Sequence, residues 1–149
     1  MSVSRFACAT LAILAFSPLW SNAAPTDAIV RFEIASLRNA QGDVGCLIFN
    51  SSDGYPETHA KAYKEIHAAI DGDHAVCEFK AVTPGTYAVI VFHDENKNGK
   101  MDKNFLGVPQ EGYVASNNVR PLMSAPKFKE ASFVVPAASV TAIKLQIRY

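Results

Sequence analysis

The sequence lacks the short motifs that accompany common catalytic sites. It contains no Gly-x-Ser-x-Gly elbow, no His-Glu-x-x-His pair and no glycine-rich loop that could cradle a phosphate. Its four histidines do not make a hydrolase by themselves, because a catalytic base also needs a nucleophile within hydrogen-bonding reach. These absences favour a protein that binds a partner over one that catalyses a reaction.

An excess of charge of one sign is also lacking. The chain has 14 Lys and Arg residues and 14 Asp and Glu residues, so its formal net charge is zero. If an N-terminal segment containing Arg5 is removed, 13 basic residues remain against 14 acidic ones, and the net charge is −1. The overall balance therefore indicates neither a nucleic-acid partner nor an anionic membrane.

Long apolar runs are absent except at residues 6–16, which follow the positive Arg5. This run is too short to span a bilayer, and Ser21-Asn22-Ala23 places small residues where a signal peptidase reads them. We therefore expect a signal sequence at residues 1–23, with cleavage after Ala24 as the alternative. The remainder, residues 24–149, is expected to be one domain in the periplasm or outside the cell, with no membrane span.

Cysteine is scarce, with three residues in the chain. Cys8 falls inside the expected signal sequence, which leaves Cys46 and Cys77, both in apolar segments. In an oxidising compartment such a pair predicts a disulfide, and two buried free thiols are the alternative. Closing a loop of this length would stabilise the fold by roughly 3–4 kcal/mol in the chain-entropy model.

Most of the remaining chain alternates apolar and polar residues, which is the pattern of strands with one buried face. Residues 44–49 and 87–92 are instead apolar on both faces, which suits central strands of a covered sheet. Further strands are expected at residues 30–35, 64–70, 73–79, 131–135 and 141–149.

Turn signals separate these strands, and long helical patterns are missing. Asp71-Gly72 predicts a type I′ hairpin between residues 64–70 and 73–79. Residues 57–63 are expected to form a short helical turn. The fold class predicted from this pattern is all-β, a single antiparallel β-sandwich of the immunoglobulin-like or prealbumin-like kind. His67, Asp71, Asp73 and His74 crowd the hairpin, but a polar turn explains them more simply than a metal site.

The most distinctive segment is the long connection at residues 94–118, which directly follows the apolar strand at residues 87–92. Side-chain oxygens alternate along it, and Gly99 stands where a tight loop must turn. Asp94, Asn96, Asn98, the carbonyl of Lys100 and Asp102 fit the first nine positions of a Ca²⁺ loop.

The match to a Ca²⁺ loop ends at position twelve, where Phe105 replaces a bidentate glutamate. Lys97, Lys100 and Lys103 also cancel the local acidic charge, so the expected affinity for Ca²⁺ is low. A metal-free turn closed by Asn and Asp side chains is the alternative. Glu111 would supply the missing carboxylate only by folding back onto the loop.

Motifs in a fixed order connect this region with a known family. They are Pro84-Gly85-Thr86-Tyr87-Ala88-Val89, then residues 93–102, then Asn104-Phe105-Leu106-Gly107-Val108-Pro109, then Glu111-Gly112-Tyr113 and Ser116-Asn117-Asn118. Together they resemble the signature of an exported bacterial family, domain of unknown function 2141. The resemblance implies a β-sandwich of the transthyretin or carboxypeptidase-regulatory type and brings no established activity. The loop is also similar to those of calcium-stabilised β-domains in bacterial surface adhesins, except at Phe105.

Other residues around the loop have two interpretations each. His93 is expected to hydrogen-bond the backbone near the loop, and it is also the one candidate for a catalytic base. Tyr113, Ser116, Asn117 and Asn118 would make a polar, aromatic surface for a sugar or peptide. Alternatively, these four residues brace the Asp94 turn through bonds from side chain to backbone.

The leading hypothesis is a non-catalytic exported module whose 94–118 connection braces the fold or binds a ligand. Ca²⁺ is its one candidate cofactor, and its partner is unknown, with a protein or carbohydrate of the cell envelope as candidates. The alternative is a small periplasmic hydrolase in which His93 acts with Asp94 or Glu111.

Overall fold

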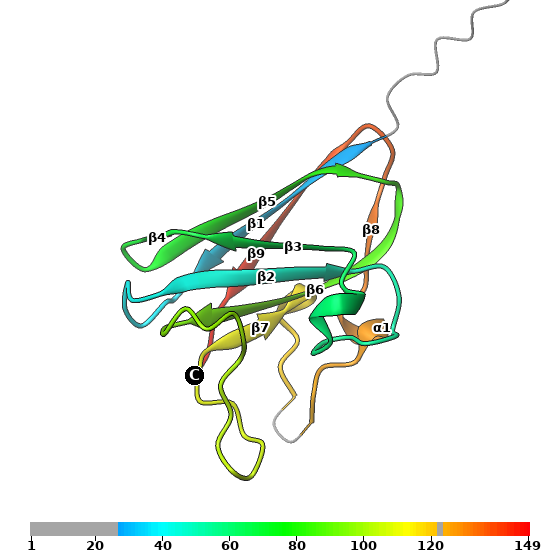
Figure 1. Cartoon of the computed structure of the whole chain (residues 1–149). Coiled ribbons are helices and arrows are strands. Elements are labelled where there is room, and N and C mark those ends of the chain that lie inside the picture. The colour runs from blue at the N-terminus through cyan, green and yellow to red at the C-terminus, as the bar shows by residue number, and fades with distance from the viewer. Residues whose placement is uncertain (1–26, 122–123) are drawn as a thin grey trace, which may run out of the picture.

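The computed structural model describes residues 27–121 and 124–149, which form two β-sheets packed face to face (Figure 1). The first sheet contains, in spatial order, β4 (Ile70–Asp71), β5 (His74–Val82), β1 (Ala28–Ala35) and β9 (Val140–Gln146). The second contains β3 (Lys64–Ala68), β2 (Asp43–Phe49), β6 (Gly85–Asp94) and β7 (Tyr113–Ala115), with β8 (Phe133–Val135) paired to β6. The predicted all-β sandwich is therefore confirmed.

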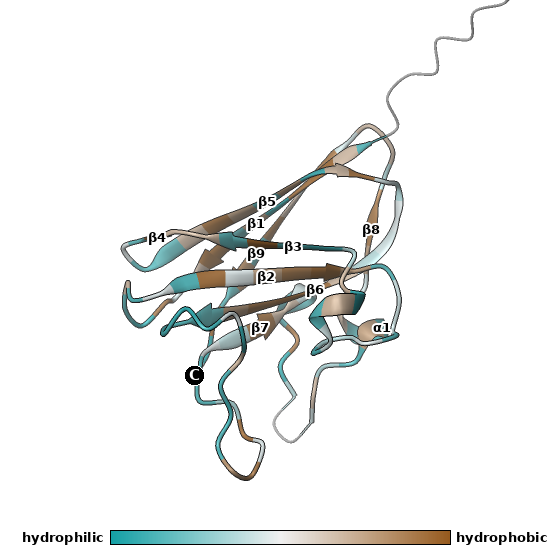
Figure 2. Cartoon of the chain, in the orientation of Figure 1, coloured by the Kyte–Doolittle hydropathy of each residue, from teal (hydrophilic) through white to brown (hydrophobic). Residues whose placement is uncertain are grey.

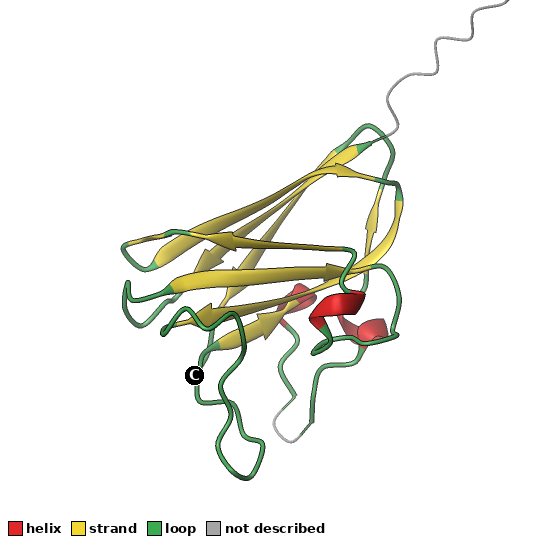
Figure 3. Ribbon diagram, viewed as in Figure 1, coloured by secondary structure: helices red, strands yellow, loops and turns green. Residues whose placement is uncertain are grey.

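Helical structure is limited to short turns beside the second sheet (Figure 3). These are the 3-10 turns η1 (His59–Lys61) and η2 (Ser116–Asn118) and the one-turn helix α1 (Phe128–Ala131). The helical turn expected at residues 57–63 is confirmed in η1. No helix in the described stretches is long and apolar enough to cross a membrane. The expected signal sequence at residues 1–23 lies outside the described residues.

The second sheet is covered on both faces, which explains why its central strands are apolar throughout. In β2, Cys46 and Ile48 belong to the core between the sheets, whereas Leu47 and Phe49 belong to a second apolar cluster. All four of these side chains are fully buried. The second cluster lies on the outer face of the sheet, where Tyr55 and other residues outside the strands pack against it. This covered outer face positions the candidate site.

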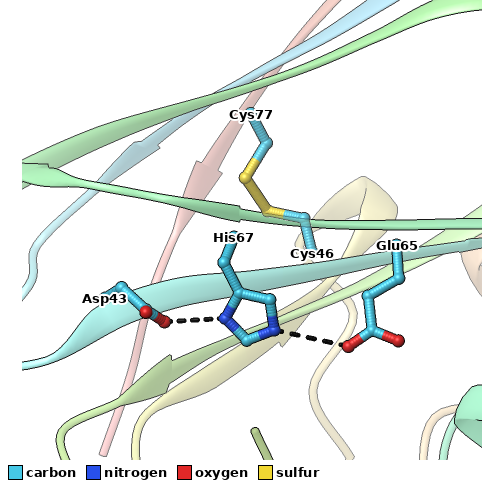
Figure 4. The surroundings of a disulfide bond; sticks show 5 residues. All are labelled: Asp43, Cys46, Glu65, His67 and Cys77. Carbon is cyan, nitrogen blue, oxygen red and sulfur yellow. Dashed lines mark hydrogen bonds and ion pairs between the residues drawn. A yellow bond between two sulfur atoms is a disulfide. The ribbon is translucent and has the colours of Figure 1, made fainter. Parts of the chain in front are cut away.

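A disulfide between Cys46 of β2 and Cys77 of β5 joins the two sheets (Figure 4). The two sulfur atoms are 2.03 Å apart, and the cysteines are 31 residues apart in sequence. Both cysteines are fully buried in the core. The predicted bridge is therefore confirmed.

The hairpin expected around Asp71-Gly72 is only partly right. β3 pairs with β2 in the second sheet, so only the two residues of β4 pair with β5. The chain changes sheets at Ala69, between β3 and β4. The two central residues of the turn are Gly72 and Asp73, and of these only Gly72 has a positive φ, 65°. A glycine with positive φ at the first central position is typical of a type II′ turn, not of the expected type I′ turn.

The physical reason for this crossing lies in the alternation of the segment itself. Ile66 and Ala68 of β3 pack against the core from one sheet, and Ile70 of β4 packs against it from the other. Because these three side chains face the core on either side of the crossing, their spacing alone does not specify which sheet each residue joins.

The C-terminal strand also differs from expectation. β9 pairs with β1 in parallel, in contrast to the antiparallel pairing expected throughout. It ends at Gln146 instead of continuing to Tyr149, and Arg148 then bridges to Tyr113 in the second sheet. Ile147 is buried in the core at this point, so the chain end crosses from one sheet to the other and lies beside the start of β7.

Candidate functional site

The long connection leaves the second sheet at Asp94, the last residue of β6, which is completely buried. The two carboxylate oxygens of Asp94 accept the backbone N–H groups of Asn98 (3.0 Å) and Gly99 (2.7 Å). Gly42 passes directly beside this position, since a Cβ atom there would lie 1.8 Å from the carbonyl oxygen of Asp94. The end of β6 therefore fixes the start of the loop through a buried carboxylate.

Asn96, Asn98 and Asp102 close the turn. The side-chain amides of Asn96 and Asn98 donate to the two carboxylate oxygens of Asp102, at 2.7 Å and 2.9 Å. Their side-chain oxygens accept backbone N–H groups, Asn96 from Asn98 (3.0 Å) and Asn98 from Lys100 (2.8 Å). Such Asx-type bonds stabilise a turn without any ligand.

Glu111 folds back onto the loop from the strand side and is 5% exposed. One of its carboxylate oxygens accepts the N–H of Glu95 (2.9 Å), and the other accepts the N–H of Asp102 (3.0 Å). Glu111 therefore clamps two loop positions that are seven residues apart in the chain. We call the hydrogen bonds of Asp94, Asn96, Asn98, Asp102 and Glu111 the loop brace.

The structure brings the side chains expected to bind Ca²⁺ together, but it engages their oxygens with N–H groups. If Asn96 and Asn98 turned their oxygens toward Asp102 to hold a cation, they would lose their bonds to the backbone of Asn98 and Lys100. Lys100, whose carbonyl was the expected ligand, takes part in the loop brace through its N–H. In the folded chain the turn is closed by hydrogen bonds among Asn96, Asn98 and Asp102.

His93, directly before the loop, is completely buried, and both of its ring nitrogens have partners. Nε2 donates to the carbonyl oxygen of Gln41 (2.7 Å), because a carbonyl can only accept. In the neutral ring Nδ1 therefore accepts from the hydroxyl of Tyr149, 2.6 Å away. The hydroxyl of Tyr149 in turn accepts the N–H of Arg38 (3.0 Å). His93 thus ties β6 to the β1–β2 connection and to the C-terminus.

Glu95 secures the outer side of the same junction. Its carboxylate accepts two hydrogen bonds from the guanidinium of Arg38 and one from the amide of Asn39. The hydrogen bond from Arg38 is the main reason that the pKa of Glu95 is lowered to about 2. Glu95 is therefore an anion throughout the physiological range.

Ser116, Asn117 and Asn118 do not brace the Asp94 turn, which was one of the two expectations for them. The buried hydroxyl of Ser116 accepts the N–H of Val89 (2.9 Å) and donates to the carbonyl of Ala131. Asn117 donates to the carbonyls of residues 130 and 132, and Asn118 bonds the backbone of residues 144 and 146. These three residues follow the C-terminal end of β7, whereas the loop precedes β7. Their polar groups hold β6, α1 and the end of β9 together.

The polar residues expected at the hairpin are not brought to one point. His74 pairs with Asp73, whereas His67 lies on the other sheet, 2.8 Å from Asp43 and 3.3 Å from Glu65 (Figure 4). Burial alone would lower the pKa of His67, but the hydrogen bonds and charges of Asp43 and Glu65 outweigh it and raise the pKa. Asp43, His67 and Asp94 offer ligand atoms within 4.8 Å of one another, and each of these residues already has hydrogen-bond partners.

An apolar pocket lies between the loop and the outer face of the second sheet, with a cavity volume of about 690 Å³. Its floor is formed by Leu47, Ile90, Phe92 and Tyr113, all of which are buried. The walls come from three segments that are far apart in sequence, and they include Pro56, Met101, Val108 and Pro126. In Figure 1 the loop projects beyond the end of β6, next to the segment that leads into α1.

Of the site residues expected from the sequence, Tyr113 and Lys100 line this pocket. No local sequence pattern indicated the pocket, because its walls come from segments that are far apart in the chain. The partners of His93 were missed for the same reason, since Gln41 and Tyr149 lie 52 and 56 residues away from it. The exposed run at residues 104–109 is the one local signal that could have indicated a wall, because an apolar loop is unusual.

Comparison with known protein families gives a match that includes the loop and the floor of the pocket. The model of a bacterial family described as "Uncharacterized protein conserved in bacteria (DUF2141)" matches residues 32–144, from β1 to β9 with the whole loop between them. Neither a curated protein nor a solved structure matches the chain. The family resemblance found in the motifs between Pro84 and Asn118 is therefore confirmed. The chain belongs to the DUF2141 family of uncharacterized proteins conserved in bacteria.

Proposed function

We propose that this protein is a non-catalytic, exported binding module that holds an apolar ligand between the loop at residues 94–112 and the second sheet. The observation that carries the proposal is the pocket of about 690 Å³, which is lined mainly by apolar side chains. Ligand sites of small molecules commonly have volumes of about 300–1,000 Å³ and few polar groups. The pocket matches such sites in both size and chemistry.

The loop brace supports this role because it makes the loop a lasting wall of the pocket. Asp94 and Glu111 are buried and use all four of their carboxylate oxygens to accept backbone N–H groups. Charge-assisted bonds of this kind are among the stronger hydrogen bonds in proteins. The wall is then set by the sequence of the loop, and Ca²⁺ is not required to form it.

Export is part of the proposal and draws on two features. The expected signal sequence at residues 1–23 would direct the chain out of the cytoplasm. The disulfide between Cys46 and Cys77 is typical of oxidising compartments, such as the periplasm. We also propose that the sandwich is of the transthyretin or carboxypeptidase-regulatory type, as the family resemblance implies.

The hydrolase alternative has no observation in its favour. His93 would have to reach a substrate, but it is fully buried and both ring nitrogens are engaged with Gln41 and Tyr149. Asp94 and Glu111 bond backbone N–H groups and not the imidazole of His93. A general base must contact the proton that it abstracts from the substrate, and this arrangement leaves no ring nitrogen of His93 free for a substrate.

Titration with Nile red, a neutral apolar dye, tests the proposed pocket. Val108 lines the pocket and is 53% exposed, whereas Val134 in β8 is 67% exposed and lies outside the pocket. We expect dye fluorescence to saturate with the wild-type protein. Val108→Glu should weaken dye binding about tenfold or more, because it places a charge in an apolar wall. Val134→Glu is the matched control and should bind as the wild type does.

Far-UV circular dichroism and the melting temperature of both variants show whether the sandwich is intact. Dye binding that is absent in the wild-type protein, or equal in the two folded variants, would refute the pocket as a binding site.

A further inference from the structure

The outer face of β3, an edge strand of the second sheet, carries polar side chains that converge. Ile66 and Ala68 of this strand pack against the core, so the alternate residues Glu65 and His67 face outward. Figure 2 shows hydrophilic and hydrophobic segments along β3, in teal and brown. His59 of η1 reaches the same place, and its Nδ1 lies 2.9 Å from Oε1 of Glu65. Nε2 of His67 lies 3.3 Å from that same oxygen.

The two imidazole rings share one apolar support, the ring of Phe92 in β6. This ring lies over Gly45 of β2, where a Cβ atom would come within 2.4 Å of it. The rings of His59 and His67 each make an edge contact with Phe92, with ring centres 6.2 Å apart in both cases. The missing side chain at Gly45 therefore makes room for the ring that positions both histidines.

Asp43 orients the ring of His67 from its other nitrogen. Nδ1 of His67 donates to Oδ1 of Asp43, 2.8 Å away, because an ionised carboxylate can only accept. In the neutral ring Nε2 then carries a lone pair, which faces the carboxylate of Glu65 (Figure 4). Two acceptors that face each other repel unless a proton or a cation lies between them. A carboxylate on the far nitrogen is also the usual partner of a histidine that binds a metal ion.

We propose that His59, Glu65 and His67 bind a divalent transition-metal ion such as Zn²⁺. The ligand atoms are Nδ1 of His59, Nε2 of His67 and the carboxylate of Glu65. Zn²⁺ binds imidazole and carboxylate at about 2.0–2.2 Å, so the ligand atoms of a tetrahedral site lie roughly 3.3 Å apart. The distances of 2.9 Å and 3.3 Å from the Glu65 oxygen to the two nitrogens are close to this spacing. All three side chains are about one-third exposed, which leaves an entry path and room for the rings to close around the ion.

The hydrogen bonds that the ion would replace join its ligands to one another. The contacts of His59 and His67 with Glu65 are exchanged for bonds to the metal, and no backbone group loses a partner. The neighbouring set of Asp43, His67 and Asp94 differs, because Asp94 already accepts two backbone N–H groups of the loop brace. The set on β3 and η1 can therefore bind an ion without disturbing the loop.

On this face of the sheet, carboxylates outnumber the free cations. The carboxylates are those of Asp43, Glu65 and Asp94. The basic residues that line the two cavities beside the cluster are Lys97, Lys100 and Lys103. Lys103 pairs with Glu57 at 2.6 Å, and Lys61 of η1 pairs with Asp53 at 2.7 Å. Lys64 donates to the carbonyl of Ala81 in the first sheet. Three carboxylates against two remaining lysines leave a net negative charge, which favours a cation.

Calorimetric titration with Zn²⁺ of the untagged protein, first treated with EDTA and then dialysed, tests the site. We expect one Zn²⁺ per chain. His59→Gln and His67→Gln should each weaken binding by about 100-fold or more, because each removes a ligand and not only an outer partner. His74→Gln is the matched control and should bind as the wild type does, because His74 pairs with Asp73 on the hairpin.

Asp43→Asn separates the orienting role of Asp43 from that of a ligand. It should weaken Zn²⁺ binding by about 10–100-fold and leave one ion per chain, as is typical for an outer partner of a metal-binding histidine. Zn²⁺ affinity should be the same with and without millimolar Ca²⁺, because Ca²⁺ prefers six to eight oxygen ligands over imidazole.

Long-range ¹H–¹⁵N NMR of the wild-type imidazoles identifies the ligand atoms without any substitution. We expect Zn²⁺ to shift the signals of Nδ1 in His59 and Nε2 in His67, and to leave those of His74 and His93 in place. Shifts at His74 or His93 in place of the expected two would overturn the proposal.

The absence of heat on adding Zn²⁺, or equal affinities of the His59→Gln, His67→Gln and His74→Gln proteins, would also overturn the proposal. Circular dichroism of each variant checks the fold, and the NMR measurement on the wild-type protein does not depend on it. Because the dye titration can be run in EDTA, failure of the metal site and failure of the pocket can be distinguished.

Discussion

A buried carboxylate that accepts two backbone N–H groups cannot be replaced without leaving one of them unpaired. Glu111 is such a residue, and its two partners lie on opposite arms of the loop, at Glu95 and Asp102. Its removal would therefore loosen the loop at two points. Asp94 has the same character at the start of the loop, but it is also part of β6, so Glu111 is the cleaner site for a test.

Glu111→Gln should lower the free energy of unfolding by about 1–3 kcal/mol. One amide oxygen can still accept a hydrogen bond, but the new NH₂ group meets an N–H donor in a buried place. Urea unfolding followed by circular dichroism measures the change. Glu57→Gln is the control, because Glu57 is 62% exposed and should change stability by about 0.5 kcal/mol or less. Equal effects of the two substitutions would contradict the clamping role of Glu111.

The pair of Glu95 and Arg38 predicts a loss of stability in acid. The pKa of Glu95 is about 2 in the folded protein, below its ordinary value of 4.5, chiefly because of the hydrogen bond from Arg38. The stabilisation is therefore fully present above pH 4.5 and is lost as the pH falls from 4.5 toward 2. Glu95→Gln lacks this titration.

Melting temperatures of the wild-type protein and of Glu95→Gln, measured against pH, test this assignment. Their difference should be constant above pH 4.5 and should shrink between pH 4.5 and pH 2. A difference that keeps its full size down to pH 2 would mean that the substitution acts through packing and not through the carboxylate charge.

At the scale of the elements, the disulfide is the one covalent cross-link between side chains of the two sheets among the described residues. It joins a central strand of the second sheet, β2, to β5 of the first sheet, and it closes a segment that contains η1, β3 and β4. The bridge reduces the freedom of this segment in the unfolded chain, where its entropy would otherwise oppose folding.

Reduction of the bridge should lower the free energy of unfolding by about 3–4 kcal/mol, as the chain-entropy model gives for a loop of 31 residues. Urea unfolding with and without dithiothreitol measures this value. Both cysteines are buried, so reduction should require partial unfolding and equilibration must be complete. Identical urea midpoints with and without the reductant would contradict the expected stabilisation.

The elements also show where sequence patterns stop being informative. Most strands of the two sheets and the turn at η1 follow from local alternation and turn residues, and they were predicted, whereas β7 lies inside the segment that was expected to be a connection. The crossing at Ala69 was not predicted, because Ile66 and Ile70 face the core from different sheets while keeping the same spacing. The parallel pairing of β9 with β1 was missed for a related reason, since strand direction is set by the whole chain path and not by the pattern of one strand.

At the scale of the whole molecule, the candidate site combines a predictable part with an unpredictable one. The spacing of Asp94, Asn96, Asn98 and Asp102 indicated a compact turn, and the structure brings these residues together. The same spacing could not distinguish a Ca²⁺ loop from a turn closed by hydrogen bonds, because both use the same side-chain oxygens. That distinction depends on Glu111 and on the orientation of two amides, which only the folded chain displays.

The pocket is also a property of the whole molecule, because segments far apart in the sequence form it. Its floor is the outer face of the second sheet, which was predicted to be apolar, but its walls come from the loop and from two other connections. The loop brace holds one wall in place. The proposed ligand binding therefore depends on the loop brace.

Amide hydrogen exchange of the loop, measured by NMR in the presence of EDTA, tests this dependence most directly. The N–H groups of Glu95, Asn98, Gly99 and Asp102 bond the carboxylates of Asp94 and Glu111. We predict that these four amides exchange slowly in the chelator and that millimolar Ca²⁺ leaves their rates unchanged. Rapid exchange in EDTA that becomes slow only when Ca²⁺ is added would contradict a loop closed by its own hydrogen bonds.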